Sequence, residues 1–108
     1  TDTSGNVIYE RNPSEPITIL QPQTVEYMTK MLSDVVAVGG TGGRARASGV
    51  LGGKTGTSNG NRDAWIVGAT KDLVVGVWMG NDDFTPMDSK VTGGTIPAEI
   101  FREIIQKQ

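Results

Sequence analysis

Two β-prone runs separated by a very short connection constrain this chain more than any other feature. Residues 64–70 and 73–80 are rich in Val, Ile and Trp, the side chains that suit a pleated, half-buried surface. Only Lys71 and Asp72 lie between the two runs. So short a connection makes the segments antiparallel neighbours. We therefore expect a β-hairpin here, and any fold proposed for the chain must contain it.

We expect one more strand and two helices around this hairpin. A strand is expected at 53–58, and a helix from about Pro22 to Gly39–Gly40, where glycine suits a left-handed cap. A final helix is expected after Thr95, a capping residue, with Pro97 in its first turn. The apolar faces consist of Val25, Met28, Leu32, Val35 and Val36 in the first helix and Ile100, Phe101, Ile104 and Ile105 in the last. This order predicts an α+β fold, with helices on one face of an antiparallel sheet.

The first residues are expected to form a separate small hairpin over 1–12. Ser4-Gly5-Asn6 supplies turn residues, and the β-prone run Val7-Ile8-Tyr9 follows it. Pro13 and Pro16 then bracket a loop before the first long helix.

Two absences from the composition exclude several chemistries. The chain has no Cys and no His, so thiolate catalysis, disulfides and Cys-based zinc sites are ruled out, and so is the commonest general base. Any acid–base chemistry must use Lys, Asp, Glu or Tyr. With a net charge of −2 and scattered basic residues, no nucleic-acid partner is expected. We predict no metal or cofactor site.

The hydropathy pattern gives no sign of a membrane segment. No apolar run approaches the ~20 residues that a membrane span needs, and no signal peptide opens the chain. We expect no membrane contact from this segment itself, so that any anchor of a parent protein lies outside it.

Two glycine-rich patterns resemble nucleotide-binding loops but lack the required context. Gly53-Lys54-Thr55 matches the end of a phosphate loop, yet Ser48 stands where its first glycine belongs. Gly40-Thr41-Gly42 with Ala45 matches a dinucleotide fingerprint, but it follows a helical pattern instead of a strand. A helix cap and a surface loop explain the second segment better.

The Lys-Thr-Gly tripeptide at 54–56 lies on the first expected strand and is followed by Thr57 and Ser58. At a sheet edge, Gly56 would let another extended backbone lie close alongside. Thr55 and Thr57 alternate with Gly56, so their hydroxyls share one face, and together with the Lys54 ammonium they form a cradle for a carboxylate. A backbone N–H just after Gly56 would face a developing oxyanion, an interaction worth ~3 kcal/mol.

An ordered set of segments resembles a known family. The segments are Lys54–Ser58, Arg62–Trp65, Val77–Asp83 and Thr92–Gly94, with Gly40–Ala45 upstream. Together they resemble class A penicillin-binding proteins, which are bifunctional, with glycosyltransferase and transpeptidase activities. The resemblance covers essentially the whole chain. It implies that residues 1–108 form the C-terminal portion of a transpeptidase domain, a partial β-lactamase/transpeptidase-like fold.

The resemblance also implies roles for individual residues. Lys54 would interact with a serine of a second motif and steer protons and substrate charge. Thr55 and Thr57 would hold the carboxylate of a D-Ala-D-Ala stem peptide or of a β-lactam, and the Thr57 N–H would form half of an oxyanion hole. Lys54 and Thr57 are thus the expected catalytic residues, and Lys54, Thr55, Gly56, Thr57 and Ser58 the expected substrate-binding residues. The implied location is the periplasmic face of the cytoplasmic membrane.

The chain departs from the family pattern at the nucleophile. That pattern needs Ser-x-x-Lys and Ser-x-Asn, and no serine here has a lysine three positions later. Ser4-Gly5-Asn6 matches Ser-x-Asn literally, but it precedes an expected strand, and we interpret it as a turn. We expect both motifs upstream of Thr1, so that the upstream part is a necessary partner and residues 1–108 alone are inactive.

Two other functions remain compatible with the residues. A non-catalytic α+β module can bind a peptide along the 53–58 strand by strand addition. A β-lactamase or D,D-carboxypeptidase can carry the same Lys-Thr-Gly strand.

Overall fold

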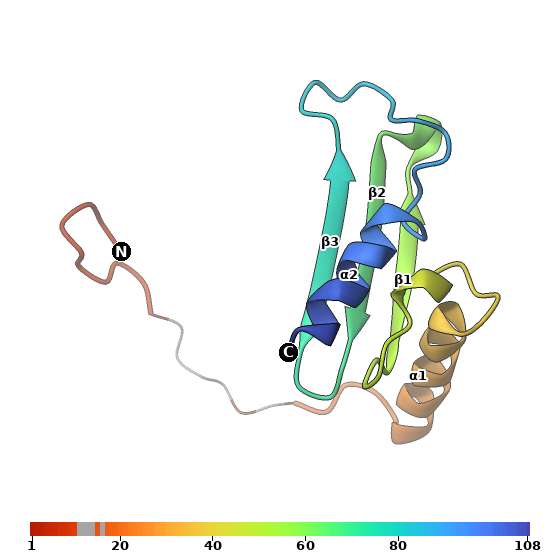
Figure 1. The fold of residues 1–108 in the computed structure, drawn as a ribbon. Coiled ribbons are helices and arrows are strands. Elements are labelled where there is room, and N and C mark those ends of the chain that lie inside the picture. The colour runs from red at the N-terminus through yellow and green to blue at the C-terminus, as the bar shows by residue number, and fades with distance from the viewer. Residues whose placement is uncertain (11–14, 16) are drawn as a thin grey trace.

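A computed structural model describes residues 1–10, 15 and 17–108 of the chain. Its body is an antiparallel sheet with strand order β1-β2-β3, one helix beside β1 and another lying across a sheet face (Figure 1). The elements are helix α1 (Pro22–Val36), 3-10 turn η1 (Gly43–Ala45), strand β1 (Gly52–Thr57), 3-10 turn η2 (Asn59–Asn61), strands β2 (Asp63–Ala69) and β3 (Val74–Gly80), and helix α2 (Ile96–Gln106). The predicted α+β class is confirmed.

The hairpin of β2 and β3 forms as predicted. Its register pairs Trp65 with Trp78 and continues without interruption to the turn. In that turn the Thr70 N–H donates a hydrogen bond to the Leu73 carbonyl at 2.8 Å, and the Leu73 N–H donates to the Thr70 hydroxyl at 3.1 Å. The threonine side chain therefore takes part in closing the turn at Lys71 and Asp72.

The core lies between α2 and one face of this sheet. Ala64 and Ile66 of β2 are fully buried, as is Phe101 of α2. The core cluster consists of Val36, Ala45, Ile66, Val77, Ala98, Phe101 and Ile105. Gly68 permits the close packing, because a Cβ at this position would stand 2.6 Å from Cζ of Phe101. The alternation of buried and exposed residues along β2 thus sets which sheet face α2 covers.

Helix α1 begins at Pro22 as predicted and ends at Val36, shortly before Gly39, whose φ of +86° is left-handed. Its last turns pack on β1 so closely that a Cβ on Gly52 would lie 2.8 Å from Cβ of Leu32. Val25, on the expected apolar face, is 48% exposed. The second half of α1 is therefore the half that contacts the sheet.

Helix α2 follows Thr95, which occupies the predicted N-cap position without capping the helix through its side chain. Instead the Thr95 hydroxyl accepts a hydrogen bond from the Thr92 N–H at 2.9 Å and donates one to the Thr92 carbonyl at 2.8 Å. This threonine closes the preceding loop instead of the helix. Pro97 lies in the first turn, as predicted.

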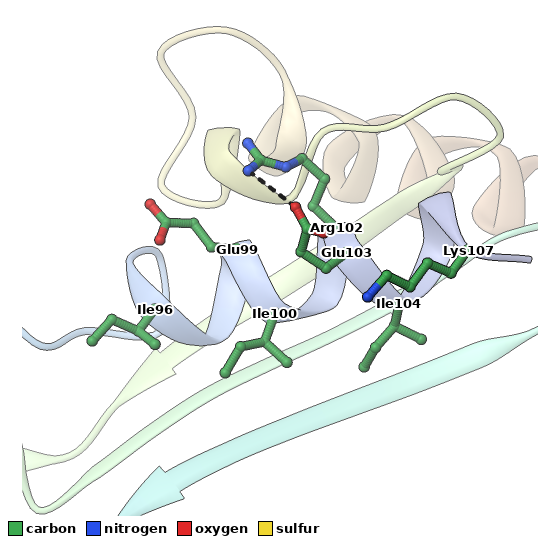
Figure 2. Close-up of a pocket in the computed structure, with 7 residues that line it drawn as sticks. All are labelled: Ile96, Glu99, Ile100, Arg102, Glu103, Ile104 and Lys107. Carbon is green, nitrogen blue, oxygen red and sulfur yellow. Dashed lines mark ion pairs between the residues drawn. The ribbon is translucent and has the colours of Figure 1, made fainter.

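A second, partly exposed apolar row runs along α2 and borders a hollow of about 440 Å³ (Figure 2). The row consists of Ile96, Ile100 and Ile104, and the rim is charged, with Glu99, Arg102, Glu103 and Lys107. On this rim, Nη2 of Arg102 lies 3.8 Å from Oε1 of Glu103. None of these residues belongs to β1, so the hollow is separate from the Lys-Thr-Gly strand.

The predicted N-terminal hairpin is wrong in its strand. A turn is present, because the Asp2 N–H donates to the Asn6 carbonyl at 2.9 Å and Gly5 has a φ of +84°. Hydrogen bonds from the Asn6 side chain and from backbone N–H groups lower the pKa of Asp2. Residues 7–9 form no strand, since no described strand pairs with them to satisfy their backbone groups. The predicted loop between Pro13 and Pro16 lies outside the described residues, apart from Glu15.

Among the described residues, neither helix combines the length and the apolar content that crossing a bilayer requires.

The contact between Gly68 and Phe101 yields a test of the core. Gly68→Ala places a methyl group 2.6 Å from Cζ of Phe101, and we expect this overpacking to lower the free energy of unfolding by about 1–3 kcal/mol. Gly76→Ala is the matched control on the neighbouring strand, where the nearest atom, Cγ2 of Val67, would be 3.7 Å away. Urea denaturation measures both variants. Equal destabilisation by the two would contradict the packing of α2 on β2.

Candidate functional site

The Lys-Thr-Gly residues lie on β1, which is an edge strand of the described sheet. Strand β1 pairs with β2 on one side, in the register Thr55 to Ile66 and Gly56 to Trp65. Lys54 is therefore in an extended segment, and no helix begins there. This geometry contradicts a phosphate loop, which needs a helix directly after the lysine.

The hydrogen-bond alternation of an antiparallel pair directs the backbone groups of Thr55 and Thr57 to the free edge. The Ser58 N–H donates to the Asp63 carbonyl at 2.9 Å, in the continued register of the two strands. Because every second residue of an antiparallel strand bonds to the same neighbour, Gly56 and Lys54 also direct their backbone groups to β2. The N–H groups of Thr55 and Thr57 accordingly point away from the sheet, where an incoming strand or an oxyanion would lie.

Lys54 extends along this free edge from the opposite face to the threonines. It pairs with Val67, on the sheet face away from α2, and its ammonium donates a hydrogen bond to the Thr55 carbonyl at 2.7 Å. The expected cradle with all three groups on one face is thus wrong for the lysine, because successive residues of a strand point to opposite faces. The three groups instead flank the edge from both sides.

The two threonine hydroxyls share one face, as predicted, and each already has a partner. The Thr55 hydroxyl lies 3.0 Å from the Thr41 hydroxyl. The Thr57 hydroxyl oxygen accepts a hydrogen bond from the Gly93 N–H at 3.1 Å. Two loops that are distant in sequence therefore hold the side chains of one strand.

Glycines allow these loops to reach β1. A Cβ on Gly93 would lie 2.0 Å from the Trp65 carbonyl oxygen and 2.6 Å from that of Gly56. A Cβ on Gly94 would lie 1.9 Å from the Thr41 carbonyl oxygen. Side chains at these two positions are incompatible with the packing, so the 92–94 loop rests directly on β1 and on the loop after α1.

The other two predicted substrate-binding residues have different surroundings. Gly56 is half-buried, and a Cβ there would make only an ordinary contact, 3.6 Å from Cβ of Trp65. Within the described residues, no contact thus requires glycine at this position. Ser58 lies just beyond β1, and its hydroxyl oxygen accepts a hydrogen bond from the Asp63 N–H at 2.8 Å. Ser58 therefore stabilises the connection to β2.

Arg62 and Asp63 stabilise the connection between β1 and β2, next to the site. The Arg62 guanidinium donates to the Phe84 carbonyl and lies over the Phe84 ring, 5.1 Å from its centroid. The Asp63 carboxylate accepts a hydrogen bond from the Trp78 indole at 3.0 Å. The Trp78 and Trp65 rings are 6.3 Å apart on the exposed sheet face. These tryptophans pack on the sheet and are not part of the core.

The acidic loop after β3 uses its carboxylates in local turns. Asp83 accepts hydrogen bonds from the hydroxyl and the N–H of Thr85, which lower its pKa. Asp88 accepts one from the Lys90 N–H at 2.8 Å. The described residues contain no cluster of acidic side chains arranged to hold a metal ion.

Sequence reasoning missed Thr41 and the 92–94 loop as parts of the site. The sequence pattern predicts a helix cap and a surface loop at Gly40-Thr41-Gly42, and Thr92–Gly94 contributes only to the family resemblance. A helix end does lie there, since the Gly42 N–H donates to the Val35 carbonyl at 2.9 Å. The signal that was available is a threonine next to paired glycines in each segment, which is typical of close backbone approach.

The sequence-family model described as the penicillin-binding protein transpeptidase domain matches residues 3–106 of this chain. The chain belongs to the penicillin-binding protein transpeptidase family. The resemblance to class A members is confirmed by the relatives. Penicillin-binding protein 1A of Clostridium acetobutylicum is 35% identical over 106 residues, and its namesake in Pseudomonas aeruginosa is 39% identical over 95 residues. Penicillin-binding protein 1B of Vibrio cholerae is 33% identical over 108 residues.

The matched region is a small part of each relative. It covers 97% of this chain but 13% of the Clostridium protein, and 86% of this chain but 11% of the Pseudomonas protein. For the Vibrio protein the shares are 97% and 13%. The chain therefore spans between 11% and 13% of the length of these relatives.

The docking of the 92–94 loop yields a second test. Gly93→Ala directs a methyl group at two backbone oxygens of the sheet, and we expect a loss of at least about 2 kcal/mol of unfolding free energy because backbone cannot move aside cheaply. Gly56→Ala, with an ordinary 3.6 Å contact, is the control and should stay within about 1 kcal/mol of the unmodified protein. Thermal unfolding measures both. A Gly93→Ala variant as stable as the control would refute the docked loop.

Proposed function

We propose that this chain is the C-terminal part of a serine D,D-transpeptidase domain and that β1 is its substrate-binding strand. The single observation that carries the proposal is the free edge of β1, where Lys54, Thr55 and Thr57 meet outward-pointing backbone groups. Membership of the transpeptidase family supports the same reading. The proposed reaction is the cross-linking of peptidoglycan stem peptides.

The free edge suits a peptide in extended conformation. Outward N–H and C=O groups of Thr55 and Thr57 can pair with a peptide backbone as an added strand does. Because the Thr57 hydroxyl oxygen accepts from Gly93, its hydrogen is available to donate to a ligand. The lysine ammonium contributes a positive charge at the same edge. A peptide that ends in a carboxylate matches this combination of donors.

The proposed chemistry is acyl transfer through a serine that lies upstream of this chain. The serine oxygen attacks the carbonyl carbon of the D-Ala-D-Ala bond, an acyl-enzyme forms, and the terminal D-Ala leaves with a proton on its nitrogen. An amine of a second stem peptide then attacks the ester and releases the serine. The Thr57 N–H would stabilise the tetrahedral oxyanion, while Lys54 would steer protons and substrate charge. A β-lactam would acylate the same serine by ring opening.

The proposal places this segment outside the cytoplasmic membrane, where peptidoglycan is assembled. The membrane anchor and the serine-bearing motifs would then belong to upstream sequence of the same protein.

Lys54 gives the direct test of the site. In the complete protein, Lys54→Ala should lower the rate of labelling by a fluorescent penicillin by at least about 100-fold, the scale of a lost proton-transfer or charge-binding group. Lys71→Ala, which removes an exposed lysine from the β2–β3 turn, is the matched control and should label normally. Normal labelling of Lys54→Ala would rule out the assigned role.

The position of the nucleophile is tested by dissection. Residues 1–108 alone should not be labelled by fluorescent penicillin, whereas the protein with its upstream half should be labelled. Mass spectrometry of the acylated peptide should locate the adduct on an upstream serine. An adduct on a serine within residues 1–108 would contradict the assignment, and peptide binding without any acylation of the longer protein would favour a non-catalytic binding module.

A further inference from the structure

Thr41 is held in place by glycines on both sides of it. The turn that contains it wraps the end of α1, where a Cβ on Gly40 would lie 2.3 Å from the Val35 carbonyl oxygen. Gly94 of the 92–94 loop lies against the Thr41 carbonyl, since a Cβ on Gly94 would be 1.9 Å from the Thr41 carbonyl oxygen. The backbone of Thr41 is thus fixed between α1 and the 92–94 loop, although its side chain remains accessible.

This placement brings Thr41 against Thr55 on β1. A Cβ on Gly42 would lie 3.4 Å from Cγ2 of Thr55, which shows how closely the turn approaches the strand. The two threonine hydroxyls are 3.0 Å apart, a hydrogen-bond distance in which either oxygen can be the donor. One hydroxyl therefore has its hydrogen engaged, and the other keeps its hydrogen for a further partner.

The neighbouring Thr57 shows which direction of the hydrogen bond leaves a hydroxyl hydrogen for a ligand. At Thr57 the bond is unambiguous, because the Gly93 N–H can only donate, so the Thr57 hydroxyl accepts and its own hydrogen stays free. If Thr41 donates to Thr55 in the same sense, both β1 hydroxyls offer a hydrogen on the same strand face. Two O–H donors then converge on one anion, and each is polarised by the bond that its oxygen accepts.

We propose that Thr41 is a positioning residue whose hydroxyl donates to Oγ1 of Thr55, so that the Thr55 hydroxyl donates to the carboxylate of a ligand lying along β1. This inference rests on the proposed function, which supplies the carboxylate. Thr41 need not touch the ligand. Its effect is to orient one hydrogen and to hold the Thr55 side chain in a single rotamer.

The experiment measures the second-order rate of acylation by a fluorescent penicillin in the complete protein. Thr41→Val keeps the branched shape without the hydroxyl and should lower this rate by about tenfold, the effect of one hydrogen bond to a charged acceptor. Thr41→Ser restores the hydroxyl and should recover most of the rate, within about threefold of the unmodified protein. Thr29→Val is the matched control, since its hydroxyl bonds within α1 to the Val25 carbonyl, and it should label normally.

Two further arms separate positioning from a general structural effect. In a Thr55→Val background the Thr41→Val change should have no additional effect, because residue 55 then has no hydroxyl for Thr41 to orient. With a penicillin whose carboxylate is esterified, Thr41→Val and the unmodified protein should react at similar rates. Thr41→Ala removes the same hydroxyl without adding bulk, so it should also lose about tenfold in rate, and it tests the role of the hydroxyl even if the valine variant folds poorly.

The outcomes distinguish this inference from the proposed function. Absence of labelling in the unmodified complete protein would overturn the proposed function. Normal labelling of that protein with no loss in Thr41→Val and Thr41→Ala would overturn the role of Thr41 alone. A loss that persists unchanged in the Thr55→Val background, or with the esterified penicillin, would show a structural defect and would equally overturn it.

Discussion

The close approach of two glycine loops to β1 is the contact on which the rest of this site depends. Gly93 lies directly on the backbone of Gly56 and Trp65, and Gly94 lies on the Thr41 carbonyl. Without side chains at these positions, the loops can supply partners to the hydroxyls of β1. A shift of about an ångström in either loop would break hydrogen bonds of 3.0 and 3.1 Å.

Strand β1 serves two purposes through its alternation. Its even-numbered residues bond to β2 and place the strand in the sheet, while its odd-numbered residues direct their backbone groups to the free edge. The threonine side chains face the loops, and the Lys54 ammonium reaches the edge from the other face. A ligand lying along the edge would therefore meet donors from both sides, an arrangement that suits a peptide with a terminal carboxylate.

Local pattern was sufficient for the elements of the main body. The hairpin and both helices follow from apolar periodicity and from the short turn at Lys71 and Asp72, and the family followed from ordered motifs. The pattern failed at residues 7–9, where β-prone side chains form no strand because a strand needs a partner. It also failed at Thr95, whose capping role depends on a hydroxyl that instead bonds to Thr92.

The sequence by itself determined where the β2–β3 hairpin lies, because alternation and turn length are local properties of a chain. Only the tertiary structure decided that Thr41 and Gly93 hold the hydroxyls of Thr55 and Thr57. The physical reason is that these partners are separated by 14 and 36 residues along the chain. A local sequence pattern cannot predict a contact between residues so far apart in the sequence, because the contact forms only when α1, β1 and α2 pack together.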